Sequence, residues 1–233
     1  MSCGKVIFIC VVVCSAALDL RGQPTPPTSR PVMKYHDNHS VASDPGGVTL
    51  SKERILKLEP ALAAAPADAS PAERAKYSLD MLTEHLKFGD SRAAVVVSVD
   101  PLLVAAYTDE LDCVVMLRFP DWLVKEYKLE VGSPLVTVNT YPRQQAPDLV
   151  HGPADLKRWG NVFPIIADFV TDDMDRVKAR KAEITEDEWK RCAEMASEYR
   201  RKFPDRYRDG SPLHSMEPRL EVQQTRPGAT TQP

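Results

Sequence analysis

Three apolar, β-branched runs separated by two short turns constrain this chain more than any other feature. The runs lie at residues 93–99, 102–108 and 113–119, with Asp100-Pro101 and Asp109-Glu110 between them. Short strands joined by turns this tight predict an antiparallel three-stranded meander. None of the runs alternates cleanly between apolar and polar residues, which indicates a sheet covered on both faces. Helices on two sides, or a partner subunit on one side, would provide that cover.

Other elements follow on either side of the meander. A fourth strand is predicted at 135–141, and capping boxes at Ser70-Pro71-Ala72-Glu73 and Thr185-Glu186-Asp187-Glu188 predict two helices. The second helix has an apolar face made of Trp189, Cys192, Ala193, Ala196, Tyr199 and Phe203. Residues 164–182 are assigned to a helix because apolar residues recur there at helical spacing, although 162–170 also fits a strand.

These elements together predict an α+β fold in a single domain at residues 70–208. Its core would be a mainly antiparallel four-stranded sheet, a three-strand meander plus one strand, covered by helices. Residues 18–69 are rich in Pro and Ala and predict a largely disordered tether with a short helix at 51–65. Residues 209–233 are polar and proline-containing, and they predict a disordered tail.

The N-terminus has the pattern of an export signal. Lys5 precedes an apolar run that ends near Leu18, and small residues at Ser15 and Ala17 suit cleavage after Ala17. Residues 1–17 are therefore predicted to be a signal peptide, and the protein to be exported to a periplasmic or extracellular location. An uncleaved N-terminal anchor and a lipid-modified cysteine are the alternatives.

Charge restricts the partners of this chain. Its 233 residues include 30 Lys and Arg against 33 Asp and Glu, for a net charge of −3, so nucleic acid is not an expected partner. Membrane contact is expected only through the N-terminal segment if it is retained, and homodimerisation through a sheet face is open. An envelope or extracellular protein, or a small ligand, is the expected partner.

Catalytic motifs are absent from the sequence. It contains no G-x-S-x-G elbow, phosphate-binding loop, dinucleotide fingerprint or H-E-x-x-H pair, so no catalytic, cofactor-binding or metal-binding residue is assigned and no cofactor is expected. The acidic groups around Asp109 and Asp172 are read as solvated charges rather than a calcium site. The basic end of the last helix, from Arg200 to Arg208, is read as a solvated face.

A candidate pocket comes from the long loop after the fourth strand. It would be lined by Tyr141, Arg143, His151, Trp159 and Asp168. An aromatic ring, a cation and an imidazole on one loop can line a ligand site. Alternatively, Trp159 plugs the loop against the core, and Asp168 makes a structural ion pair with Arg118.

Two cysteines remain after removal of the signal. Cys113 and Cys192 both lie on apolar faces, and export favours oxidation, which makes them a candidate disulfide. Two separate buried thiols are the alternative. The leading functional hypothesis is a non-catalytic, exported binding or interaction module. An envelope or extracellular enzyme with a site on the 141–161 loop, and a structural or assembly subunit, are the alternatives.

Overall fold

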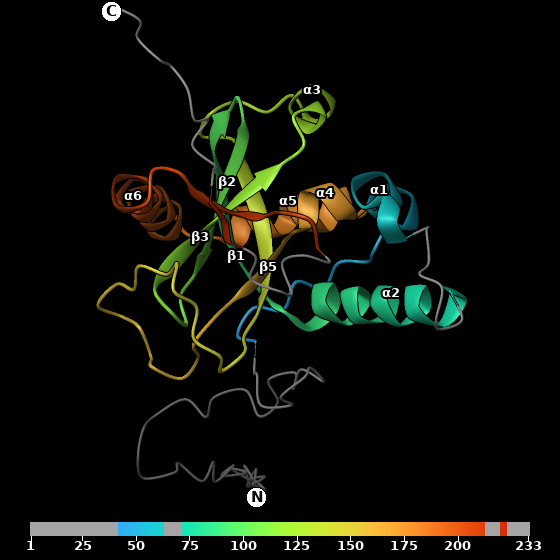
Figure 1. The fold of residues 1–233 in the computed structure, drawn as a ribbon, viewed down its shortest axis with the longest axis horizontal. Helices are drawn as coiled ribbons and strands as arrows, with labels where there is room; N and C mark the ends of the chain where they lie inside the picture. The colour runs from blue at the N-terminus through green and yellow to red at the C-terminus, as the bar shows by residue number, and fades with distance from the viewer. Residues whose placement is uncertain (1–41, 63–70, 213–219, 223–233) are drawn as a thin grey trace, which may run out of the picture.

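A computed structural model describes residues 42–62, 71–212 and 220–222 of the chain (Figure 1). These residues form an α+β fold around one mixed sheet with the strand order β5-β4-β1-β2-β3-β6-β7. The strands are β1 (Asp90–Val99), β2 (Leu102–Thr108), β3 (Cys113–Phe119), β4 (Pro134–Thr140), β5 (Phe163–Ile166), β6 (Arg206–Asp209) and the three-residue β7 (Leu220–Val222). All neighbours pair antiparallel except β3 and β6, which are parallel.

The prediction of a mainly antiparallel four-stranded sheet is wrong. The meander β1-β2-β3 and strand β4 form the centre of the sheet, but β5 adds to β4 at one edge, and β6 and β7 extend the other. Strands β5, β6 and β7 have at most four residues each, too few to show a period of two in the sequence.

The prediction of a helix at 164–182 is also wrong over its first residues. Phe163–Ile166 pairs with β4, with Val138 opposite Ile165 and Thr137 opposite Ile166. A four-residue helix, α4 (Ala167–Val170), and then α5 (Met174–Glu183) follow. The apolar residues of this stretch therefore serve first an edge strand and then two separate helices.

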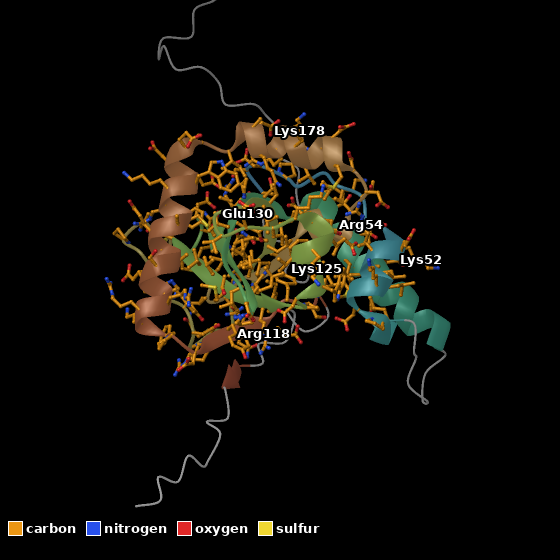
Figure 2. The ribbon with its side chains drawn as sticks, turned by 90° about the horizontal axis from the view of Figure 1, so that it is seen from above. Lys52, Arg54, Arg118, Lys125, Glu130 and Lys178 are labelled. Carbon is orange, nitrogen blue, oxygen red and sulfur yellow. The ribbon has the colours of Figure 1, made fainter. Side chains whose placement is uncertain are left out.

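The remaining helices are α1 (Lys52–Leu58), the 3-10 turn η1 (Pro60–Leu62), α2 (Pro71–Phe88), α3 (Trp122–Tyr127) and α6 (Glu186–Lys202). Helix α6 begins as its capping box predicts, because the Thr185 side chain accepts a hydrogen bond from the backbone N–H of Glu188. It packs against β1, β2 and β3 on one side of the curled sheet, whereas α1 and α2 lie on the other side (Figure 1). Figure 2 shows the same arrangement from above, with Lys52 and Arg54 on α1 far from α6.

Residues 42–50, which the sequence places in the tether, pack against the sheet. The backbone N–H of Gly46 donates to Gly89 O at 2.9 Å, and that of Ser91 donates to Asp44 O at 2.8 Å. Val48 is buried in the core. A Cβ on Gly46 would lie 2.5 Å from Leu86 O, so this close approach of two backbones requires glycine.

Several predictions lie outside the described residues. They are the signal at 1–17, the tether at 18–41 and 63–69, the helix cap at Ser70, and the tail at 213–219 and beyond 222. Within the expected tail, residues 220–222 instead form strand β7. The helix expected at 51–65 begins as predicted, since the Ser51 side chain caps it by accepting from Arg54 N. It is shorter than expected and ends at Leu58.

Candidate functional site

Tyr141 and Trp159 are the two residues of the candidate pocket that come together. Their rings stack with centroids 6.1 Å apart, and both side chains are buried. The Tyr141 hydroxyl accepts a hydrogen bond from Thr108 Oγ1 at 2.9 Å and donates to Asp90 Oδ2 at 3.3 Å. Burial raises the pKa of Tyr141 well above its ordinary value. Trp159 thus packs into the core beside Tyr141.

The other three residues of that pocket point elsewhere. Arg143 is exposed, and His151 Nδ1 lies 3.3 Å from Asp155 Oδ2. Asp168 accepts a hydrogen bond from Val136 N at 2.8 Å and pairs with Lys181, not with Arg118. Across the described residues, no hydrogen bond, ion pair or ring contact joins these three to Tyr141 or Trp159.

A charge cluster centred on the buried side chains of Asp90 and Arg92 lies beside Tyr141, at the start of β1. Arg92 NH2 lies 3.1 Å from Asp90 Oδ2 and 2.7 Å from Asp109 Oδ2, and Arg92 NH1 lies 2.7 Å from Asp44 Oδ2. The guanidinium of Arg92 thus joins residues 42–50, strand β1 and the turn after β2. Sequence reasoning missed this cluster, although Asp90 and Arg92 at the start of an otherwise apolar strand were a signal.

The carboxylates of this cluster titrate differently. Burial, with the nearby charge of Asp109, raises the pKa of Asp90 to about 7 although Arg92 opposes the rise. Partial burial acts to raise the pKa of Asp44, but hydrogen bonding and charge from Arg92 lower it overall. Because Asp44, Asp90 and Asp109 all pair with the buried Arg92, the cluster ties residues 42–50 and the turn after β2 to β1.

A cleft of about 660 Å³ lies between α6 and β1. It is lined by Val95, Val96, Val97, Val131, Gly132, Pro134, Glu186, Trp189, Lys190, Ala193, Ala196, Ser197 and Arg200. Its volume lies within the range of about 300–1,000 Å³ that is typical of small-ligand sites. Trp189 is half-buried and Ala193 is exposed, so the apolar face of α6 extends past the part that the sheet covers.

A second hollow, of about 370 Å³, lies at the end of β3 and is lined by Arg118, Phe119, Pro120, Asp121 and Asp209. Its walls are mostly polar, and the Arg118 guanidinium already donates to the Tyr207 hydroxyl at 2.7 Å and stacks on that ring. It is therefore a weaker candidate than the cleft beside α6.

Cys113 and Cys192 are both free and buried in the structure. Cys192 Sγ lies 3.8 Å from Ala93 O and 3.7 Å from Ala105 O, so it faces the backbone of β1 and β2. Burial raises the pKa of both thiols far above the ordinary value, which leaves neither as a ready nucleophile.

Comparisons with known proteins give no assignment: no family model, no curated protein and no solved structure matches this chain. Within the described ranges, no group of three or more His, Cys, Asp or Glu side chains is arranged to hold a metal ion. No helix in the described part of the chain has the length and apolar character needed to cross a membrane.

Proposed function

We propose that this protein is an exported, non-catalytic binding module whose ligand occupies the cleft between α6 and β1. One observation carries the proposal: the apolar stripe of α6 is wider than the sheet beneath it, which leaves Trp189 and Ala193 beside an unfilled cleft of about 660 Å³. Partly exposed apolar side chains gathered in a concave site are typical of ligand-binding surfaces.

The lining supports binding rather than chemistry. Its side chains are aliphatic or aromatic apart from Glu186, Lys190, Ser197 and Arg200, and it contains no cysteine or histidine. The Ser197 hydroxyl donates to Ala193 O at 3.0 Å, and among the described residues no hydrogen bond joins it to a histidine or carboxylate that could act as a base. An enzyme site on the 141–161 loop has less support, because its candidate residues are spread over separate contacts.

Titration with 1-anilinonaphthalene-8-sulfonate, an amphipathic dye, tests the proposed site. Wild-type protein should bind the dye, and Ala193→Phe should weaken binding about tenfold or more by filling the cleft. Ala179→Phe is the matched control, since Ala179 is an exposed alanine on α5 outside the cleft. Near-ultraviolet circular dichroism verifies that both variants keep their packing. Equal dye binding by the two variants would overturn the assignment of the cleft.

Export rests on the N-terminal pattern of Lys5 followed by an apolar run and small residues. N-terminal sequencing of protein recovered outside the cytoplasm should begin between Ala16 and Asp19. Recovery with Met1 intact would favour an uncleaved anchor.

A further inference from the structure

The cleft runs lengthwise along α6. Its lining residues from that helix recur at spacings of three or four, from Glu186 through Lys190, Ala193 and Ser197 to Arg200. Glu186 and Arg200 are fourteen positions apart, which corresponds to about 21 Å at 1.5 Å per residue. An extended peptide advances about 3.3 Å per residue, so the cleft matches the length of about six residues.

Opposite charges stand at the two ends of the cleft. Arg200 NH1 donates to Val97 O at 3.3 Å, which holds the guanidinium at the floor formed by β1. Among the described residues no carboxylate pairs with Arg200, and no cation pairs with Glu186 at the other end. The third charged lining residue, Lys190, has its ammonium 3.9 Å from the Glu194 carboxylate.

Apart from Lys190 and Ser197, the stretch between the two ends of the cleft is apolar on both sides. Val95 and Val97 of β1 form the floor, with Ala193 of α6 on one wall. The turn before β4 forms the opposite wall with Val131, which is 66% exposed, and Pro134. A ligand that fills this space must be elongated and apolar along most of its length.

We propose that the cleft takes an extended, mainly apolar peptide segment of about six residues, acidic at the Arg200 end and basic at the Glu186 end. This proposal rests on the proposed binding function and names the ligand class of the same site. A peptide is favoured over an acyl chain with a carboxylate head because such an acid would satisfy Arg200 and leave Glu186 against hydrocarbon. Charges at both ends would select the segment and fix its position.

Blocked hexapeptides with the core Val-Ala-Val-Ala test this ligand class. Wild-type protein should bind the peptide with lysine at one end and aspartate at the other roughly fivefold more tightly than one with glutamine at both ends. Glu186→Lys should shift the preference to aspartate at both ends, and Arg200→Glu should shift it to lysine at both ends. The N-terminus of the peptide can lie at either end of the cleft, so these changes in charge preference do not depend on the direction in which the peptide binds.

Two neighbouring substitutions are matched controls. Asp187→Lys and Arg201→Glu make the same charge changes at exposed positions of α6 that do not line the cleft, so they should leave the preference unchanged. If the control variants also change which peptide binds more tightly, the preference comes from general attraction between the charges of α6 and the peptide. That result would overturn the peptide proposal.

The outcomes separate this proposal from the proposed function. If Ala193→Phe blocks the dye but no peptide binds at millimolar concentration, the cleft is a binding site and the peptide proposal fails. Tighter binding of dodecanoate, unaffected by Glu186→Lys, would replace the peptide with an acyl chain. If Ala193→Phe leaves dye binding unchanged and no peptide binds, both proposals fail.

Discussion

Asp148 and Arg208, sixty residues apart in the sequence, form a buried two-pronged ion pair. Arg208 Nε donates to Asp148 Oδ2 at 2.6 Å, and Arg208 NH2 donates to Asp148 Oδ1 at 2.7 Å. The Arg208 side chain is 2% exposed and the Asp148 side chain is 0% exposed. Asn161 Oδ1 and Val162 O accept further hydrogen bonds from the same guanidinium, so Arg208 of β6 holds the long loop after β4 at Asp148, in its interior, and at its C-terminal end.

Removing one partner of this pair should be strongly destabilising. Asp148→Ala leaves the Arg208 charge buried without a counter-ion, a change that typically lowers the free energy of unfolding by about 3–5 kcal/mol. Glu194→Ala is the control, because it breaks an exposed pair with Lys190 and should cost less than about 1 kcal/mol. Urea unfolding measures both. If both variants lower the free energy of unfolding by a similarly small amount, the Asp148–Arg208 pair does not hold the loop in place.

The raised pKa of Asp90 predicts a pH dependence of stability. Its pKa is about 7 in the fold against 3.8 in an ordinary environment, so between those values the native state holds a proton that the unfolded chain has released. The stability that Asp90 contributes is therefore fully present below about pH 4 and is lost above about pH 7. Between these values it falls by up to roughly 1.4 kcal/mol per pH unit.

Asp90→Asn should flatten this dependence, since an amide does not ionise. The free energy of unfolding, measured at pH 4.5, 6 and 8, should fall less with pH in the variant than in the wild type. Asp100→Asn changes an exposed carboxylate in the turn after β1 and should leave the slope unchanged. The same slope in Asp90→Asn and wild type would show that Asp90 does not titrate in this range.

The two buried thiols should be free but slow to react. Alkylation of unfolded, unreduced protein lacking residues 1–17 should label both Cys113 and Cys192, as counted by mass spectrometry. In the native protein labelling should be far slower, because burial raises the pKa of both thiols. Unlabelled cysteines in the unfolded sample would mean that the two are joined by a disulfide.

Residues 42–50 should belong to the cooperative fold, whereas removal of the predicted tether before them should leave the stability unchanged. A chain that starts at Ala42 should keep the melting temperature of the longer one, whereas a chain that starts at Ser51 loses the Asp44–Arg92 pair and the burial of Val48. The second truncation should lower the melting temperature by about 5 °C or more. An unchanged melting temperature in both would place residues 42–50 outside the cooperative fold.

The centre of the sheet could be predicted from the sequence, but its edges could not. Strands β1, β2 and β3 are long enough for β-branched residues and turns to mark them. Strand β6 reads Arg-Tyr-Arg-Asp, which carries no apolar alternation, and in the fold its Arg208 pairs with a buried carboxylate on a distant loop. Such a pairing depends on tertiary contacts that local propensity does not contain.

Only part of the candidate site can be predicted from the sequence. Helical spacing places Trp189, Cys192 and Ala193 on one apolar face of α6, but it does not tell how much of that face the sheet covers. Cys192 is fully buried, whereas Ala193 is exposed beside the cleft. The turn that forms the opposite wall, at residues 131–134, comes from a different part of the chain, and only the fold brings it there.

Backbone amide chemical shifts on addition of the amphipathic dye test the central claim most directly. The account predicts that the largest changes map to the walls of the cleft, at Val95–Val97, Gly132 and Ala193. Ala193→Phe should abolish these changes while the rest of the spectrum stays folded. Changes centred instead on the 141–161 loop, around His151 and Trp159, would contradict the assignment of the binding site to α6 and β1.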